Sequence, residues 1–468
     1  GCFQGNVPSG GSAFPGQRLF SRECWEGRNA MGKRRHWRDI LTLNAYWIGH
    51  SFMWNSLHPI VLPILMLSFA EQAKNTAYGL LTFAGLLIAL VAQPFYGALS
   101  DRTRHRLGRR RPWVLLGAVL CVLWLVVMAL ARRFWLVATG YGLLQLSSNM
   151  AHGPAQALIP DLVPHDMRGI ASGVKNLFDM LGVILAAIVV GRILGGGATR
   201  PWGPIAVMGI VLLGAMAVTV LGVREPTLPK HPAERESSPW ARVRAALRID
   251  LRGHGNYARL LLARFFVLLG TFAVQSFALY YIRDVFEADV PARIVGNMML
   301  AIGLCVALAV LPAGALSERW GRRGLSLVAC GLTIVGLVLL GITRNVSQLW
   351  PLGCLIGLGM GIFTSVNWAW ATDLVPAGQA GKYLGLSNLA TAGSAAVSRL
   401  LGPFIDLVNA RVLNGGYVML FALAALVVFL GLLTTLGIPE TRPARGARLL
   451  PSVVSSGRGA GEGRGSSL

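Results

Sequence analysis

Two charged residues, Lys175 and Asp179, lie inside one apolar stretch of the chain and are candidates for binding and releasing a proton. Lys175 and Asp179 are four positions apart, so a helix would place both on one face. Ionisable groups inside a membrane are costly and are functional candidates by default. The pair is either a structural ion pair or a site at which Asp179 carries a proton. Other ionisable groups in apolar stretches add to it, and the candidates for proton coupling are Asp179, Lys175, Arg399 and His152.

Polar and aromatic side chains in several apolar stretches share predicted helical faces, with steps of three and four residues. One face consists of Trp47, His50, Trp54 and His58, and a second of Tyr141, Gln145, Asn149, His152 and Gln156. Further candidates for the same cavity are Gln275, Asn367, Trp368 and Asn388. Amides and imidazoles bind hydroxyl groups and an indole packs on a sugar ring, so we expect a cavity for a polyhydroxylated neutral solute. Alternatively, these groups hydrogen-bond neighbouring helices, with the Trp residues in an interfacial belt.

The composition excludes an ordinary soluble domain. Of the 468 residues, 13% are charged and 54% are hydrophobic, while the formal net charge is +23. Soluble domains carry about 25% charged residues, so this chain cannot cover a water-facing surface in the usual way. Its six Cys are scattered without a CxxC pair, which argues against a disulfide framework or a zinc site. We therefore expect no metal site and no cofactor.

Roughly twelve apolar segments are long enough to cross the ~30 Å hydrocarbon layer of a bilayer as helices. They lie near residues 40–66, 77–99, 112–131, 134–158, 170–192, 203–223, 259–281, 294–314, 324–343, 348–371, 383–405 and 416–438. These segments leave no room for a separate soluble domain. The predicted fold class is an all-α membrane protein with twelve transmembrane helices.

The largest polar insert divides the chain into two halves of six predicted spans each. We expect an N-terminal bundle at residues 40–223, a cytoplasmic linker at 224–258 and a C-terminal bundle at 259–438. The segments 1–39 and 439–468 are predicted to be disordered and cytoplasmic, because they lack the apolar residues that order a chain.

Most Lys and Arg residues fall in the segments on one side of the predicted membrane, including the run at residues 102–111. The positive-inside rule assigns this side, and with it both termini, to the cytoplasm. Insertion bias and anionic lipid account for the basic charge, so nucleic-acid binding is not expected. Residues 1–30 contain no apolar run of the kind found in a signal peptide. The predicted location is a cell membrane, of the bacterial cytoplasmic kind, with multiple passes.

The two halves repeat each other in sequence. Three pairs of segments occur in the same order: 97–102 with 314–319, 161–164 with 373–376, and 222–225 with 437–440. Gly108-Arg109-Arg110 also recurs as Gly321-Arg322-Arg323, after a four-residue insertion in the first copy. Parallel repeats of six helices predict a pseudo-two-fold axis along the membrane normal, with a cavity between the halves.

These repeated segments carry a family resemblance. Gly97-x-x-x-Asp101-Arg102 followed by Gly108-Arg109-Arg110 resembles the signature loop of the major facilitator superfamily, and residues 439–442 are similar to its marker after span twelve. The longer form of the loop, together with residues 161–173, looks most like the branch of sucrose transporters and glycoside–pentoside–hexuronide symporters. The resemblance covers residues 40–442 and implies the major facilitator fold, with two pseudo-symmetric six-helix bundles.

The resemblance also implies a cytoplasmic gate. Asp101, at the end of span two, would face the positive start of span eleven near Lys382. Glu318 would do the same toward the start of span five near Arg168. The family's pattern includes an Arg low in span four, which this chain lacks. The gate candidates are Gly97, Asp101, Arg102, Gly108, Arg109, Glu318 and Arg319.

We expect a secondary active transporter that moves a sugar or glycoside together with protons by alternating access, as a monomer in the lipid bilayer. Melibiose-type relatives bind sodium through carboxylates on span two, but residues 77–99 contain no Asp or Glu, which leaves proton coupling or facilitated diffusion. An efflux antiporter for drug-like or lipid-like molecules is the alternative, although residues 182–192 lack the Pro of that group's signature. A polytopic membrane enzyme is a remote alternative, because the predicted outside loops hold few catalytic groups.

Overall fold

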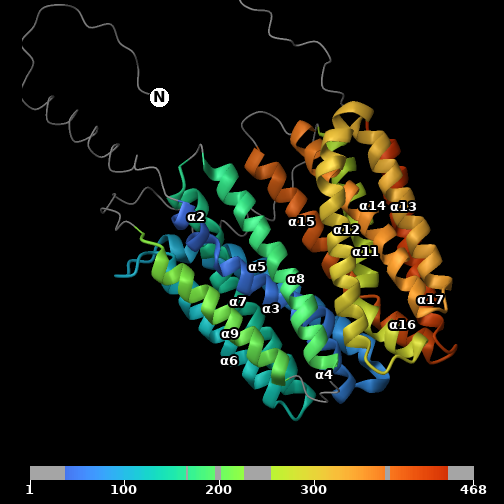
Figure 1. Cartoon of the computed structure of the whole chain (residues 1–468), viewed down its shortest axis with the longest axis horizontal. Helices are drawn as coiled ribbons and strands as arrows, with labels where there is room; N and C mark the ends of the chain where they lie inside the picture. The colour runs from blue at the N-terminus through green and yellow to red at the C-terminus, as the bar shows by residue number, and fades with distance from the viewer. Residues whose placement is uncertain (1–36, 165–166, 196–201, 226–253, 375–379, 441–468) are drawn as a thin grey trace, which may run out of the picture. The chain divides into compact units, whose positions relative to one another are not determined.

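The computed structural model describes residues 37–164, 167–195, 202–225, 254–374 and 380–440, and within them the chain forms helices and connecting loops without a strand (Figure 1). Each of the predicted spans coincides with a described helix. Ten of the described helical segments are long and apolar enough to cross a membrane. The predicted all-α membrane fold is therefore confirmed.

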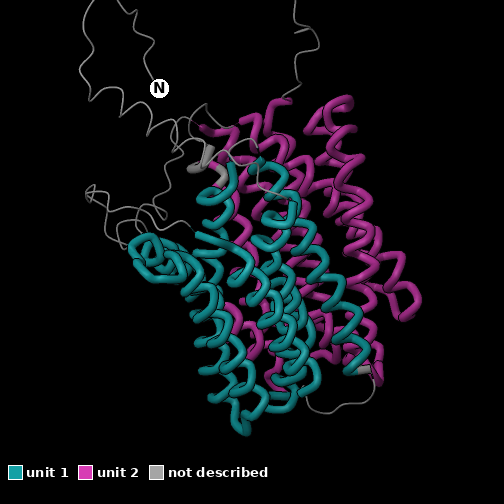
Figure 2. The backbone as a smooth tube through the Cα atoms, turned by 60° about the vertical axis from the view of Figure 1, so that its left-hand side comes forward, with its two compact units in different colours: residues 1–71, 84–247 teal, residues 72–83, 248–468 magenta. Residues whose placement is uncertain are grey.

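The described chain divides into two compact units, drawn in teal and magenta in Figure 2. Unit 1 consists of residues 1–71 and 84–247, and unit 2 of residues 72–83 and 248–468. The short segment 72–83, which belongs to the predicted N-terminal bundle, is part of unit 2. The predicted linker and the predicted disordered ends lie almost entirely outside the described residues.

The helices of unit 1 follow the predicted spans closely. They are α2 (Trp37–Asn44), α3 (Tyr46–Ser56), the π-helix η1 (Leu57–Val61), α4 (Leu62–Phe69), most of α5 (Lys74–Asp101), α6 (Arg111–Leu130), α7 (Phe134–Leu162), α8 (Arg168–Gly195) and α9 (Trp202–Gly222). The predicted span one is interrupted by η1, where the N–H of Leu62 reaches back five residues to the carbonyl of Leu57. Pro59 and Pro63 lack an N–H and so disturb the regular helical ladder at this point.

The helices of unit 2 differ from prediction at span eleven. They are α11 (Gly255–Phe286), α12 (Pro291–Trp320), α13 (Arg322–Ile342), α14 (Leu349–Leu374), α15 (Ala380–Arg399), α16 (Gly402–Asn409) and α17 (Gly415–Leu436). The single helix expected over 383–405 ends at Arg399, and a second helix begins at Gly402. Pro403 explains the break, because its ring would clash with the carbonyl of Arg399 in a continuous helix, while it is tolerated in the first turn of α16.

The first residues of α5 belong to unit 2 because polar contacts hold them there. The Asp406 carboxylate accepts hydrogen bonds from the Nδ2 of Asn75 and from the backbone N and Oγ1 of Thr76, each at 2.7 Å. Lys74 forms an ion pair with Asp284 at 2.5 Å. The helix α5 therefore begins in unit 2 and ends in unit 1.

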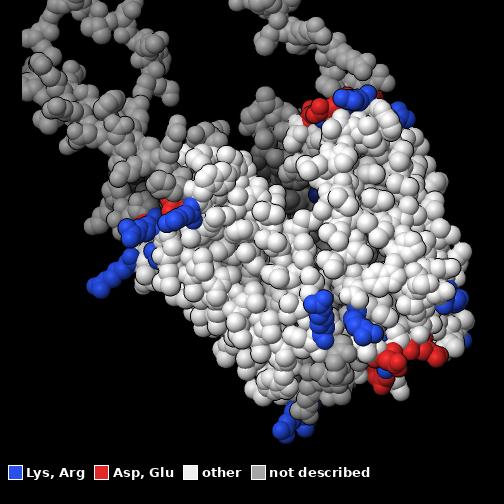
Figure 3. Space-filling model, viewed as in Figure 1, with Lys and Arg blue, Asp and Glu red and all other residues white. Residues whose placement is uncertain are grey.

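The polar side chains predicted to line a cavity are spread over several helices, two of which are less apolar than the other long helices. Helices α7 and α15 coincide with predicted spans but are not among the ten most apolar segments, because each carries a line of polar residues. Elsewhere charged side chains gather mainly near helix ends, with broad uncharged surfaces between them (Figure 3). The predicted cavity residues of unit 2 lie on α11 and α14 as well as on α15.

Candidate functional site

In unit 1 a histidine pair lies where α3 contacts α7. The Nδ1 of His152 lies 3.2 Å from the Nε2 of His50. The indole Nε1–H of Trp54 donates to the same Nε2 at 3.2 Å and to the Oγ of Ser148 at 3.0 Å. Because an indole N–H can only donate, the Nε2 of His50 acts as the acceptor in this arrangement. The hydrogen-bond network thus assigns His50 as a neutral imidazole with its proton on Nδ1.

The polar network continues along both helices. The Nε2 of His58 lies 2.9 Å from the hydroxyl of Tyr141, and the Nε2 of Gln145 donates to that hydroxyl at 2.8 Å. Gln145 and Asn149 are buried, and Asn149 donates to the backbone carbonyl of Gln145 at 2.8 Å. The two lines of residues inferred from spacing therefore lie against each other, and part of the α7 line serves helix packing.

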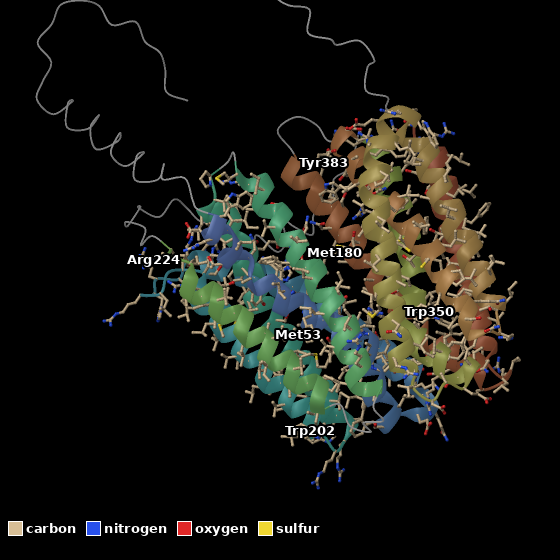
Figure 4. The ribbon with its side chains drawn as sticks, in the orientation of Figure 1. Met53, Met180, Trp202, Arg224, Trp350 and Tyr383 are labelled. Carbon is tan, nitrogen blue, oxygen red and sulfur yellow. The ribbon has the colours of Figure 1, made fainter. Side chains whose placement is uncertain are left out.

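A lysine–carboxylate pair on α8 lies beside this network. The Nζ of Lys175 is 2.7 Å from the Oδ2 of Asp179, with side chains 23% and 33% exposed. The same Nζ lies 4.2 Å from the ring centre of Trp47, whose indole meets the His152 ring at 5.0 Å between centres. Figure 4 labels one residue on each of the two helices involved, Met53 on α3 and Met180 on α8.

These contacts connect the Lys175–Asp179 pair with the histidines of α3 and α7, a connection that the sequence alone does not show. Asp179, Lys175, Trp47, His152 and His50 form a continuous series of contacts within unit 1. A proton could reach a carboxylate or an imidazole in this series, because both group types exchange protons near neutral pH when their surroundings favour it. The ion pair is compatible with both interpretations of Asp179, as a structural ion-pair partner and as a proton carrier.

In unit 2 the polar cluster centres on Arg264 of α11. Its Nε donates to the Oγ1 of Thr391 at 3.0 Å, and its Nη1 donates to the Oδ1 of Asn367 at 2.8 Å. The guanidinium carbon lies 5.8 Å from the ring centre of Trp368. Sequence analysis noted Asn367 and Trp368 as cavity candidates but left Arg264 out of the candidate site.

The remaining candidates of unit 2 occupy different positions. Gln275 and Asn388 are exposed on α11 and α15. Arg399 lies with its guanidinium carbon 5.6 Å from the ring centre of Tyr78, and its Nε is buried without a hydrogen-bond partner among the described residues. Its grouping with Asp179, in the other unit, remains a prediction.

The predicted gate loop in unit 1 forms an ion-pair network within its own unit. Asp101 pairs with the Nη2 of Arg110, which is 5% exposed. Asp161 pairs with the Nε of Arg110 at 2.9 Å and with the Nη2 of Arg109 at 2.7 Å. The basic partner that the family places in span four is thus supplied here by Arg110 at the start of α6. The contact of Asp101 with span eleven remains a prediction, because the side chain of Lys382 lies outside the described residues.

Glu225, at the end of unit 1's helices, clamps this loop through the backbone. Its carboxylate accepts from the N–H groups of Arg109, Arg110 and Arg111 at 2.7, 3.0 and 2.9 Å. Gly108 has φ of +103°, and a Cβ there would lie 2.6 Å from the Oε2 of Glu225. The motif glycine is therefore required both by its backbone conformation and by the approach of this carboxylate.

The second repeat builds a related network in unit 2. Glu440 accepts from the N–H groups of Arg322 and Arg323 at 2.6 and 3.0 Å, and Arg322 donates through Nε to Asp373 at 3.1 Å. Glu318, by contrast, is exposed and makes no hydrogen bond or ion pair with a described residue.

The other gate candidates have simpler surroundings. Arg102 and Arg319 are exposed. A Cβ on Gly97 would meet no atom within 4 Å, whereas one on Gly153 would lie 3.2 Å from the Gly97 backbone nitrogen. The close approach of α5 and α7 at this point therefore requires the missing side chain of Gly153 and not that of Gly97.

Sequence reasoning missed the roles of four acidic residues. Asp161, Asp373, Glu225 and Glu440 each occur in a repeated segment, which was the available signal. Their roles became clear only when the structure placed them on the arginines and N–H groups of the loop. Among the described residues, no three His, Cys, Asp or Glu side chains are grouped to hold a metal ion.

Known proteins resemble this chain at both sequence and fold level. A family model described as "MFS/sugar transport protein" matches residues 48–398. The multidrug resistance protein MdtG of Enterobacter lignolyticus is 24% identical over 333 residues, which cover 70% of this chain and 76% of that protein. The sucrose transport protein SUC3 of Arabidopsis thaliana is 30% identical over 123 residues, which cover 22% of this chain and 21% of its own length.

Two solved structures share the fold. A bacterial homologue of the human lysosomal transporter Spinster, in an inward-facing and unoccupied conformation, superposes with a TM-score of 0.64 at 17% identity, covering 88% of this chain and all of that one. The POT family transporter PepTSo also gives a TM-score of 0.64, at 13% identity, covering 86% of this chain and 99% of that one. With the family match over most of the sequence, these findings show that the chain belongs to the MFS/sugar transport protein family and is a multi-pass secondary transporter of a small-molecule solute.

Proposed function

We propose that this transporter carries a sugar or glycoside together with protons, by alternating access. The observation that carries the proposal is the series of contacts from Asp179 through Lys175 and Trp47 to His152 and His50. It combines groups that exchange protons with groups that bind hydroxyls, on helices that are otherwise apolar. The family match and the sucrose-transporter relatives support the choice of a sugar.

The proposal includes the setting of the protein. It acts as a monomer in a cell membrane, of the bacterial cytoplasmic kind, with both termini in the cytoplasm. The excess of Lys and Arg on one predicted side supports this orientation.

Efflux of drug-like molecules is the second candidate function. The MdtG relatives support it, because they cover more of this chain than the sucrose transporters do. Both functions use the same fold, so the nature and direction of the cargo distinguish them.

The experiment is uptake into vesicles that contain only this protein, with a panel of labelled mono- and disaccharides and with or without an inward proton gradient. Gradient-driven accumulation of a sugar supports the proposal. If no sugar is taken up but a lipophilic dye is expelled when protons flow inward, the efflux function replaces it.

The matched variant is Asp179→Asn. It should abolish gradient-driven accumulation and leave exchange at equal concentrations largely intact, because the amide keeps the shape of the carboxylate but cannot carry a proton. Asp39→Asn is the control, since the Asp39 carboxylate makes no hydrogen bond or ion pair with a described residue. Unchanged uphill uptake by the Asp179 variant would remove the carrier role from this residue.

A further inference from the structure

Arg264 is a buried cation with only neutral partners. Its side chain belongs to a residue 9% exposed, about three turns into α11. Its two hydrogen bonds go to a hydroxyl and an amide, and no carboxylate of a described residue forms an ion pair with it. The two other cations that are buried among the described residues, Arg110 and Arg322, each pair with an Asp.

The guanidinium of Arg264 also has N–H groups that make no hydrogen bond with a described residue. It offers five N–H groups in a rigid fork, and the two hydrogen bonds to Thr391 and Asn367 use Nε and Nη1. Its Nη2 group has no hydrogen-bond partner among the described residues. An isolated buried charge is expensive, so a site that retains one is poised to receive the opposite charge.

The surroundings of Arg264 suit a polar ligand with a ring. The Arg264 guanidinium lies over the ring of Trp368, which is 41% exposed and therefore still accessible to a ligand. Thr271 and Gln275 follow Arg264 on the same face of α11, at seven and eleven residues. Asn388 is exposed three residues before Thr391 on α15. This face of unit 2 therefore offers hydroxyl and amide groups around a single positive charge.

We propose that Arg264 binds a negatively charged group of the transported solute, so that the preferred cargo is an acidic sugar derivative and not a neutral one. The inference rests on the proposed function for the identity of the cargo as a sugar, and changes the neutral solute expected from sequence. Two parallel N–H groups of a guanidinium match the two oxygens of a carboxylate or a phosphate. Asn367 and Thr391 hold the guanidinium in place, and the accessible part of the Trp368 indole packs on the ring.

The test is direct binding to purified protein at pH 7 without a proton gradient, which separates it from the test of symport. The probes are methyl glucoside, methyl glucuronide and glucose 6-phosphate, which distinguish neutral, carboxylate and phosphate forms of one sugar. Benzoate and benzyl alcohol form a pair without a sugar. The wild-type protein should bind at least one acidic sugar about 10- to 100-fold more tightly than the neutral sugar, as expected for a hydrogen-bonded charge.

The main variant is Arg264→Gln, which should lose that preference while its affinity for the neutral sugar changes less than threefold. Arg259→Gln is the control, since Arg259 lies on the same helix but is exposed and donates to the carbonyl of Gly437. Asn367→Asp is a second variant that preserves size and places a carboxylate against the guanidinium. It should also remove the preference, because the charge is then paired inside the protein.

The outcomes separate the two proposals. Equal or tighter binding of the neutral sugar by the wild type, or an acid preference that survives in both variants, overturns the role of Arg264 and leaves sugar transport intact. Binding of benzoate that depends on Arg264, with no binding of any sugar, supports the anion site and overturns the sugar.

Discussion

The loop networks of unit 1 and unit 2 each contain a buried arginine at an equivalent position. The surroundings of the two arginines differ. Arg110 and Arg322 are 5% and 8% exposed, and each donates through Nε to an Asp near the end of a later helix, Asp161 of α7 or Asp373 of α14. Each also bonds a serine hydroxyl and lies under a glutamate that binds backbone N–H groups. The shared part is thus a clamp that fixes the start of α6 and of α13.

The comparison corrects the sequence alignment by one residue. Matching letters pairs Arg109 with Arg322, but the contacts pair Arg110 with Arg322. The glycines before them, Gly108 and Gly321, have φ of +103° and +94° and do correspond. Unit 1 therefore holds one extra residue after the glycine, Arg109, which contributes a second ion pair to Asp161 at 2.7 Å.

The second difference concerns the gate candidates. Asp101 pairs with Arg110, whereas Glu318 at the repeated position is exposed and makes no ion pair with a described residue. The clamp is common to both units. Among the described residues, Asp101 at the end of α5 contacts it, whereas Glu318 near the end of α12 does not. A stabilising role and a gating role can thus be assigned to different residues and tested separately.

The largest effect is expected for Glu225→Gln. The glutamate accepts hydrogen bonds from three backbone N–H groups. In the glutamine variant the side-chain NH₂ would face some of these N–H donors and could not accept from them. We expect a loss of about 2 kcal/mol of stability, or about 2–4 °C in apparent Tm of the purified protein. Glu440→Gln should lower Tm by less, because Glu440 binds two N–H groups.

The control for this pair is Glu287→Gln, since Glu287 is exposed and makes no hydrogen bond or ion pair with a described residue. It should leave Tm unchanged. An equal or larger drop for Glu440→Gln would show that the number of N–H contacts does not decide the strength of the clamp.

A smaller effect is expected for Asp161→Asn, about 1–2 kcal/mol, because Asp161 is 22% exposed and pairs with two arginines. Asp373→Asn should cost about half as much, with one ion pair and a side chain 36% exposed. Thermal unfolding measures both. In an Arg109→Gln background the cost of Asp161→Asn should fall to that of Asp373→Asn. Persistence of the difference there would show that Arg109 is not its source.

The transmembrane helices could be predicted from sequence because long apolar runs dictate them. The predicted spans coincide with described helices, and the corrections fall where a local side chain overrides the average hydropathy. Pro403 ends α15 at Arg399, and two prolines accompany the π-helix in the first span. The assignment of residues 72–83 to unit 2 depends on Asp406, a contact across more than 300 residues that no local pattern encodes.

The candidate sites could be predicted only as helical faces. Spacing correctly placed His50 and Trp54 together, and Lys175 beside Asp179. It could not place the Lys175 ammonium over Trp47, nor show that Arg264 has only neutral partners, because both facts depend on the packing of one helix against another. Sequence periodicity predicts which side chains share a helical face. Tertiary packing determines which of their charges are paired.

The smallest effect is expected for the two gate candidates, and it falls on rate. Asp101→Asn should slow turnover about fivefold, equivalent to about 1 kcal/mol, without changing which solute is preferred, because the residue lies at the end of α5 and its ion pair is partly exposed. Glu318→Gln should change turnover less than twofold if its position serves no gate. Vesicle exchange at saturating solute measures both, with protein amount matched. A changed solute preference in Asp101→Asn would contradict a remote gate. An equal slowing by Glu318→Gln would show that the gate is symmetric although the ion pairs around it are not, since Glu318 would then act only in a conformation in which it meets a basic partner.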